Sequence, residues 1–252
     1  MICWVNCDVE IRNHSKHSNF GVNELCILIW RPSARGLWSV NFLDFFQVEK
    51  IHIFCESDTD PDDIKNLRED RKLNFHFLGR RMYYKDAFQY ASDNLLRRNV
   101  MIMNADCYVD KGFEQLNVSI LNRKRMHALT RHETSKNVRL CNTGDFCGPT
   151  SHYMGSHDAF LFRDFVPLPS QLLDSIDNRP NIMGIEQGLI HYFTKYVQFN
   201  IKNPCKILYI VHHHCSKERN MTERSIQGQR LDDYLHINEE KRILYLSPFS
   251  GL

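Results

Sequence analysis

The stretch Val100-Met101-Ile102-Met103-Asn104-Ala105-Asp106-Cys107-Tyr108-Val109-Asp110 decides how the rest of the chain is interpreted. Its first four residues are all apolar, so we expect both faces of this segment to be covered, as in a central strand of a parallel sheet. Asn104 and Asp106 follow where the strand ends. Ligands of open α/β sheets bind at the carboxyl ends of strands, so we expect these two residues to lie at a binding site.

Strands and helices alternate on the amino-terminal side of this stretch. The predicted elements are strands at residues 25–30, 50–55, 73–78 and 100–103, and helices at residues 34–48, 61–72 and 83–97. Residues 1–5 can form a further strand, followed by a polar loop. The alternation predicts parallel pairing with right-handed crossovers.

The carboxyl-terminal side continues with shorter elements. We expect strands at residues 126–131, 159–162 and 207–211, and helices at residues 113–121, 172–176 and 185–196. No internal repeat or break in composition divides the chain, and 252 residues suffice for one α/β domain. We therefore predict a single domain over residues 1–252.

Composition and charge exclude several classes of protein. The formal net charge of +2 gives no reason to expect a nucleic-acid partner. No apolar run approaches the length that spans a bilayer, and Asp8 and Glu10 interrupt any signal peptide. We expect a cytoplasmic protein from these residues as they stand, or a lumenal, Golgi-type one if an anchor is missing from them.

The chain contains nine cysteines, an odd number, and no C-x-x-C pair. This pattern favours buried free thiols in a reducing compartment.

The segment Asn104-x-Asp106 can bind a divalent cation. Mg²⁺ and Mn²⁺ prefer oxygen ligands and often take only one or two protein carboxylates, with phosphates and water completing the shell. Asp106 suffices for such a site, which leaves Asn104 to bond a ribose. The alternative is that Asp106 is a turn or helix-capping residue.

Three consecutive histidines, His212, His213 and His214, follow the strand predicted at residues 207–211. In an extended segment His212 and His214 point to the same side, so they can converge on one ion or one phosphate group. Imidazole suits manganese better than magnesium. The alternatives are an exposed polar strand end and a zinc site that adds Cys205 and Cys215.

Two acidic residues lie where later elements begin. Asp158 ends the segment Gly155-Ser156-His157-Asp158 and Glu186 lies in the first turn of a predicted helix. The Glu186 carboxylate can serve as a general base toward an acceptor hydroxyl. The alternatives are that Asp158 bonds nearby backbone amides and that Glu186 only interacts with the helix dipole.

Taken together, these segments resemble the GT-A-like nucleotide-diphospho-sugar transferases, over about residues 50–220. The segments that carry the resemblance are Ile102–Asp110, Ala128-Leu129-Thr130-Arg131-His132-Glu133, Gly155–Phe162, Gly184-Ile185-Glu186-Gln187, Asn203-Pro204-Cys205-Lys206-Ile207, His212-x-His214-x-Ser216 and Arg219. The resemblance implies a GT-A-like α/β domain with a Rossmann-like, mostly parallel central sheet flanked by helices. It also implies a nucleotide-binding half over about residues 1–110, an acceptor and metal half over about 111–220, and a tail over 221–252.

The resemblance also implies roles for individual residues. Asp106, His212 and His214 would hold Mn²⁺ or Mg²⁺, and Asn104 stands in the metal motif where the family has an aspartate. The residues that would contact the nucleotide are Glu56, Asp58, Arg80 and Asn104. The residues that would face the acceptor are Asp158 and Glu186.

The expected function is transfer of a sugar from a UDP- or GDP-sugar to a glycan or other hydroxyl acceptor, by a hexosyltransferase-like enzyme of either stereochemistry. Asn104 in place of an aspartate, and an amino-terminal segment without the usual first strand, favour an alternative. In that alternative the chain is an inactive transferase fold that binds a sugar nucleotide or glycan.

Overall fold

The computed structural model describes residues 25–31, 48–56, 73–104, 107–116, 119, 121, 124–135, 139, 144–149, 151, 156–163, 166–180, 182–212 and 249–252. The strands are β1 Leu25–Arg31, β2 Val48–Cys55, β3 Leu73–Phe77, β4 Asn99–Asn104, β5 Cys107–Val109, β6 Arg125–Leu129, β7 His132–Glu133, β8 Ala159–Phe162, β9 Asn200–Lys202 and β10 Ile210–His212. The helices are α2 Tyr84–Asn94, α4 Ser170–Ser175 and α5 Ile185–Val197, with a 3-10 turn η2 at Phe113–Gln115. The predicted strand at residues 1–5 and the predicted helices at 34–48 and 61–72 lie wholly or almost wholly outside the described residues.

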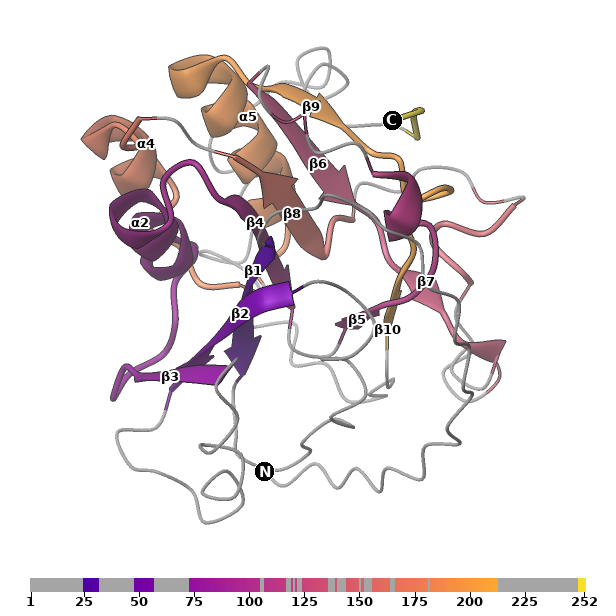
Figure 1. The fold of residues 1–252 in the computed structure, drawn as a ribbon, viewed down its shortest axis with the longest axis horizontal. Helices are drawn as coiled ribbons and strands as arrows, with labels where there is room; N and C mark the ends of the chain where they lie inside the picture. Colours follow the sequence, from indigo (N-terminus) through magenta and orange to yellow (C-terminus); the bar gives the residue numbers. More distant parts are fainter. Residues whose placement is uncertain are drawn as a thin grey trace.

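Seven strands form the central sheet in the order β3-β2-β1-β4-β8-β6-β9 (Figure 1). The pairs β3–β2, β2–β1, β1–β4 and β6–β9 are parallel, whereas β8 is antiparallel to both of its neighbours, β4 and β6. The α/β class is confirmed, and the sheet is mixed. The antiparallel direction of β8 brings its first residue to the end of β4.

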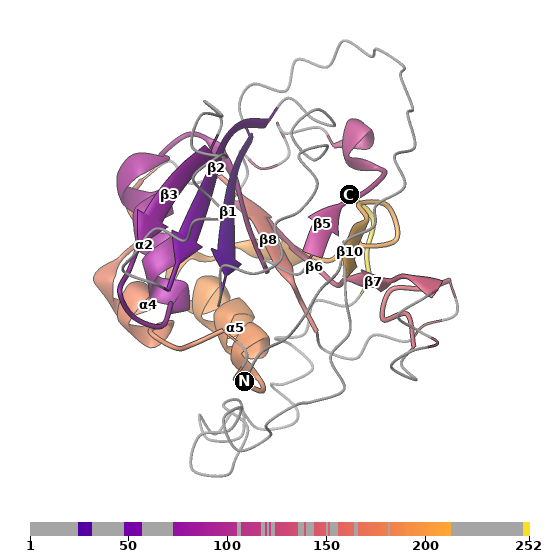
Figure 2. The ribbon, with the colours of Figure 1, turned by 90° about the horizontal axis from the view of Figure 1, so that it is seen from below.

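The described helices lie on one face of this sheet, and a small second sheet lies on the other (Figures 1 and 2). Strand β4 shows the division, because side chains alternate between the faces of a strand. Val100 and Ile102 pack with α2, α4 and α5, whereas Met101 and Met103 pack with residues of the small sheet. The prediction that β4 is covered on both faces is therefore confirmed.

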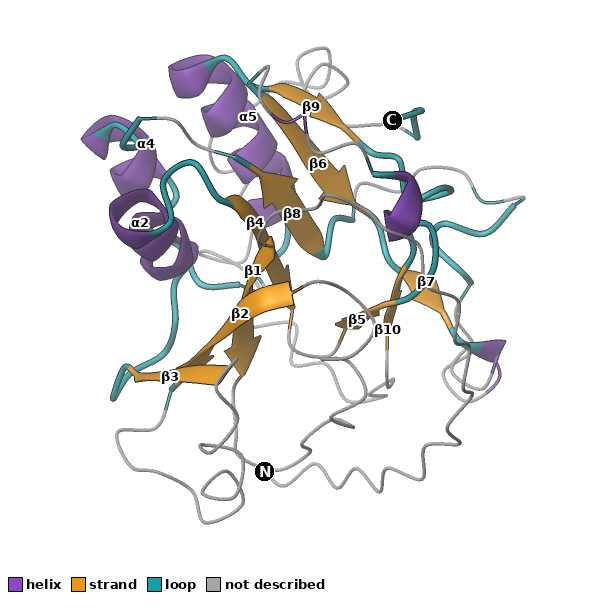
Figure 3. Cartoon of the chain, viewed as in Figure 1, coloured by secondary structure: helices purple, strands orange, loops and turns teal. Residues whose placement is uncertain are grey.

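The helical layer is held by large aromatic side chains. Phe88 of α2 and Phe193 of α5 have ring centroids 4.7 Å apart, and Phe160 and Phe162 of β8 pack against them. All four are at most 1% exposed. Burying each ring contributes about 1.5–3 kcal/mol, so this cluster fixes the helices against the sheet. Figure 3 shows α2, α4 and α5 gathered on the same side of the central sheet.

The small sheet has the order β5-β10-β7, with β10 antiparallel to β5 and parallel to β7. Gly112 lies just after β5 with a φ of 96°, and a Cβ atom there would lie 1.7 Å from the backbone oxygen of Ile207. Only glycine fits such a close approach at positive φ. The backbone bonds Asp110 N to Tyr209 O, at 2.8 Å, and Tyr209 N to Lys111 O, at 2.9 Å, continue the pairing.

Within the described ranges, no helix has both the length and the apolar character needed to cross a bilayer.

Candidate functional site

Asn104 and Asp158 meet where β4 ends. The backbone N–H of Asn104 donates to the Asp158 carbonyl oxygen at 3.0 Å, and its side-chain Nδ2 donates to Asp158 Oδ1 at 3.1 Å. The sequence singled out these two residues separately, 54 positions apart. The mixed sheet brings them together at the carboxyl end of a central strand, the edge where α/β sheets bind ligands.

The carboxylate of Asp158 is held by side chains. It accepts hydrogen bonds from Arg131 Nη1 at 2.8 Å and Ser156 Oγ at 3.2 Å, in addition to the Asn104 amide. The residue is 4% exposed. These contacts differ from the alternative in which a buried aspartate bonds only backbone amides. A carboxylate held in this way is suited to fixing the position of the guanidinium that it binds.

Arg131 follows β6 and bridges two acids. Its Nε donates to Glu133 Oε1 at 2.8 Å while its Nη1 bonds Asp158, and its guanidinium carbon lies 4.9 Å from the centre of the Phe146 ring. Burial by itself lowers the pKa of the Arg131 guanidinium, but the charges of Asp158 and Glu133 outweigh it and the pKa is raised. Arg131 is therefore a permanent buried cation with two anionic partners.

Glu133 connects Arg131 to His212. The Nδ1 of His212 lies 3.0 Å from each of the two Glu133 carboxylate oxygens, and the Glu133 side chain is 1% exposed. Burial raises the pKa of Glu133, but the hydrogen bonds from His212 and Arg131 lower it by more, so the net shift is downward. A charged Glu133 makes Nδ1 the protonated nitrogen of His212 and leaves Nε2 as the nitrogen with metal-ligand chemistry.

The five side chains form one hydrogen-bonded series, which we call the polar chain: Asn104, Asp158, Arg131, Glu133 and His212. Two carboxylates and one guanidinium give it a formal charge of −1 when His212 is neutral. A diphosphate is repelled by a site of this sign unless a cation lies between them. The charge of the polar chain therefore suits a site that takes up a metal together with a phosphate ligand.

The predicted metal ligands lie only partly in the described chain. Asp106 and His214 are outside the described residues, whereas His212 ends β10. Cys107, the residue after Asp106, is the backbone partner of His212 in the antiparallel ladder of β5 and β10. Among the residues that the structure describes, no three histidine, cysteine or acidic side chains form a metal-binding group. The metal site stays a prediction.

Glu186 lies in the first turn of α5. The helix leads into β9, which pairs in parallel with β6, so the amino end of α5 lies toward the edge where β6 ends. The polar chain lies at this same edge. The helix begins after Gly184, whose φ is 86°. An acidic side chain in the first turn of a helix interacts favourably with the positive end of the helix dipole.

Glu56 and Arg80 contact the segment that leads into α2. Glu56 Oε1 accepts a hydrogen bond from the backbone N–H of Met82 at 3.1 Å and lies 3.5 Å from Arg81 Nε. Arg80 forms a bidentate pair with Asp86, with distances of 2.9 and 2.6 Å. Arg80 also lines a hollow of about 640 Å³ between β3 and α2. None of the hydrogen bonds described here for Glu56 and Arg80, the two predicted nucleotide contacts, involves a member of the polar chain. Asp58, the third predicted contact, lies outside the described residues.

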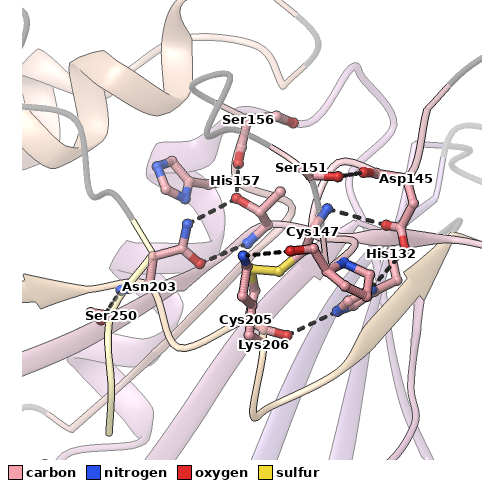
Figure 4. The surroundings of a disulfide bond; sticks show 12 residues. His132, Asp145, Cys147, Ser151, Ser156, His157, Asn203, Cys205, Lys206 and Ser250 are labelled. Carbon is pink, nitrogen blue, oxygen red and sulfur yellow. Dashed lines mark hydrogen bonds and ion pairs between the residues drawn. A yellow bond between two sulfur atoms is a disulfide. The ribbon is translucent and has the colours of Figure 1, made fainter.

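A disulfide joins Cys147 to Cys205, with 6.2 Å between the two Cα atoms, and Figure 4 shows it beside His132 and Asp145. The prediction of free thiols is wrong for this pair. Cys55 and Cys107 are buried thiols, as predicted. The two bonded cysteines are 58 residues apart, and no sequence spacing marks them as partners.

Arg131 and Glu133 are the members of the polar chain to which the sequence assigned no role. They belong to the segment Ala128–Glu133 that carries part of the family resemblance. A signal for them exists in that segment: two opposite charges separated by one residue follow the buried end of strand β6 and Thr130. Side chains at alternate positions of an extended segment share one face, which allows both to reach one site.

Comparison with known proteins gives distant likenesses only. No protein-family model matches the chain, and no curated protein matches its sequence. The chain is similar to S. aureus TarS residues 1–349 in complex with UDP, at 13% identity and a TM-score of 0.46, covering 75% of this chain and 60% of that one. It is similar to a putative glucose-1-phosphate thymidylyltransferase from Bacillus anthracis in complex with sucrose, at 10% identity and a TM-score of 0.43, covering 87% and 95% of the two chains. It is also similar to HddC from Yersinia pseudotuberculosis complexed with GMP-PN, at 13% identity and a TM-score of 0.35, covering 62% and 80%. The chain thus spans 60% of the length of the TarS fragment.

Proposed function

We propose that this chain is a glycosyltransferase that moves a sugar from a nucleotide-diphosphate sugar to a hydroxyl acceptor with the help of a divalent metal ion. The observation that carries the proposal is the polar chain, in which five side chains from four separate segments converge at the end of β4. Ligands bind at this edge in open α/β sheets. The resemblance of the same segments to GT-A-like transferases supports the same conclusion.

Asp106, His212 and His214 are the residues that would hold Mn²⁺ or Mg²⁺. The fit rests on His212, because its Nδ1 is bonded to a buried carboxylate, and metal-binding histidines usually carry such a partner on the second nitrogen. The negative formal charge of the polar chain also favours a cation. When bound, the ion would neutralise the charge that develops on the departing diphosphate.

The nucleotide would extend from this edge toward the ends of the earlier strands. Glu56 follows β2, and β2 pairs with β1, which in turn pairs with β4. We propose that Glu56 and Asp58 contact the base or ribose and that Asn104 lies beside the ribose. Arg80 would have to leave its pair with Asp86 to reach a phosphate.

Glu186 is the better candidate for the general base. Glu186 lies in the first turn of α5, whose amino end lies toward the edge of the polar chain, whereas the Asp158 carboxylate is already paired with Arg131. In an inverting reaction the acceptor oxygen bonds to the anomeric carbon, the bond to the diphosphate oxygen breaks, and the hydroxyl proton passes to Glu186. We assign Asp158 to holding Arg131 and contacting the acceptor.

A second candidate function is binding of a sugar nucleotide or glycan without catalysis. The observation that favours it is the amide at position 104, which is bonded to Asp158 and supplies no carboxylate to a metal.

The two functions differ in turnover. We would titrate the full chain with UDP- and GDP-sugars, with and without Mn²⁺, by calorimetry and thermal shift, and then follow donor hydrolysis. A ligand that binds only the native state raises the apparent stability. Asp106→Asn is expected to abolish metal-dependent hydrolysis, whereas the matched control Asp93→Asn, exposed on α2, should behave like the parent chain. Nucleotide binding without hydrolysis would support the second function. If neither UDP-sugars nor GDP-sugars bind, both proposed functions lose their nucleotide-sugar ligand and are overturned.

A further inference from the structure

Asp145 makes three contacts beside the disulfide, and Figure 4 shows it next to His132 and Cys147. Its Oδ1 accepts hydrogen bonds from the backbone N–H groups of Glu133, at 3.3 Å, and Cys147, at 3.1 Å. Its Oδ2 lies 3.1 Å from His132 Nδ1. The bond to the Glu133 backbone fixes the residue whose side chain holds both Arg131 and His212.

His132 connects Asp145 to the segment that leads into β10. Its Nε2 lies 2.9 Å from the carbonyl oxygen of Cys205. The imidazole also stacks on Tyr209, with 4.1 Å between ring centroids and 5° between ring planes. These contacts with Asp145, Cys205 and Tyr209 fix the orientation of the His132 ring.

The disulfide closes these contacts into a ring. Asp145 bonds His132, His132 bonds the backbone of Cys205, Cys205 is joined to Cys147, and the N–H of Cys147 returns to Asp145. Two parts of the ring continue into the polar chain. Glu133 follows His132 directly in the sequence, and the backbone N–H of Glu133 donates to Asp145 Oδ1.

We propose that Asp145 is a positioning residue and that the Cys147–Cys205 disulfide holds it, so that the polar chain binds a nucleotide diphosphate tightly only when this disulfide is oxidised. The inference rests on the proposed function. Removing the disulfide leaves the Asp145 loop and the Cys205 segment joined, among the described residues, through His132 and through a 3.5 Å hydrogen bond from the exposed Lys206 to the Pro149 carbonyl oxygen. Glu133 then loses a fixed backbone partner, and the orientation of Arg131 and His212 loosens with it.

The test compares the full chain before and after reduction with dithiothreitol. Calorimetry with UDP and GDP in the presence of Mn²⁺ gives nucleotide affinity, and hydrogen exchange gives the protection of the Glu133 amide. We expect about a tenfold loss of nucleotide affinity on reduction, the size usual when a residue that hydrogen-bonds and orients a ligand-binding side chain is lost. We also expect faster exchange at residues 131–133, with α2 and α5 unchanged.

Two variants separate the disulfide from other thiols. The double variant Cys147→Ala/Cys205→Ala should match the reduced parent chain, and dithiothreitol should not change it further, which controls for the other seven of the nine cysteines. Asp145→Asn keeps the disulfide but loses the charge that pairs with His132, and it should also weaken nucleotide binding. Asp145→Asn and the reduced parent chain remain informative if the double variant does not fold.

Unchanged affinity and unchanged exchange at Glu133 after reduction would overturn the inference. A chain that binds neither nucleotide in its oxidised form overturns the proposed function instead. Exchange at Glu133 still decides the positioning role in that case: faster exchange on reduction supports it, and equal exchange rejects it.

Discussion

The imidazole Nδ1 of His212 lies 3.0 Å from both carboxylate oxygens of Glu133 on the neighbouring strand. The two residues are backbone partners in the parallel pair of β10 and β7, so their side chains emerge on the same face. Both residues are buried: as whole residues, His212 is 7% exposed and Glu133 is 8% exposed. The histidine that the sequence proposed as a metal ligand is therefore held by a partner that the sequence did not identify.

Glu133→Gln should weaken metal-dependent nucleotide binding by about 10- to 100-fold, because glutamine can no longer fix the tautomer of His212 through a charged acceptor. Calorimetry with UDP or GDP, with and without Mn²⁺, measures the effect. The matched control is Glu114→Gln, an exposed residue of η2. If both variants bind alike, Glu133 does not orient a ligand.

Arg131→Met should destabilise the fold by about 3–5 kcal/mol, because it leaves two buried carboxylates, Asp158 and Glu133, without their cation. Arg131→Lys keeps the charge but cannot bond both acids through two separate nitrogens, so it should destabilise the fold by less than Arg131→Met does. Urea unfolding measures both. Arg139→Met, at an exposed position, should stay within about 0.5 kcal/mol of the parent chain. A small effect of Arg131→Met would mean that the acids rearrange or become protonated.

Stability should fall as the pH is lowered from about 6.5 to about 4. Burial lowers the pKa of His52, His127 and His157 from 6.5 to about 4. Above pH 6.5 these residues are neutral in both states. Below it the unfolded chain binds protons that the folded chain does not, which lowers the free energy of unfolding by about 1.4 kcal/mol per pH unit for each histidine.

His127 offers a direct check of this pH dependence. It is 0% exposed, and neither of its ring nitrogens has a hydrogen-bond partner among the described residues. His127→Leu should reduce the slope of stability against pH between pH 4 and 6.5 while changing stability little above that range. Denaturant titrations at several pH values measure it, and an unchanged slope would show that His127 already takes up a proton in the folded state.

Gly112→Ala should destabilise the protein by about 3 kcal/mol, because it combines a positive φ with a clash against the backbone oxygen of Ile207. The damage falls on the pairing of β5 with β10, so nucleotide binding should weaken as well. Gly144→Ala is the control, since an added Cβ there meets nothing within 4 Å. Equal stability of the two variants would show that the turn after β5 can move away.

The sequence predicted the strands well where local pattern determines structure. The apolar run Val100–Met103 indicated a strand covered on both faces, and β4 has that environment. The predicted helix at residues 83–97 appears as α2, but ends at Asn94, and Arg97 has a φ of 63°. The predicted helix at residues 113–121 is described as a 3-10 turn at Phe113–Gln115.

The rest depends on contacts between distant residues. Four apolar residues at Ala159–Phe162 predict a strand but carry no information about its direction, and that direction brings Asp158 to Asn104. The disulfide was missed for a similar reason, because Cys147 and Cys205 meet only after β9 has joined β6. The sequence assigned no role to Glu133, and only the tertiary structure shows that it is buried between Arg131 and His212.

The place of β1 in the sheet has a consequence for how the protein is made. β1 precedes the other described strands in the chain, yet it lies between β2 and β4 and pairs with both. During synthesis it emerges before either partner, and β4 follows only about 70 residues later. Until then the edge of β1 that β4 later covers exposes unpaired backbone groups, which other chains can join. We therefore expect the nascent chain to need protection from aggregation until residue 104 has left the ribosome.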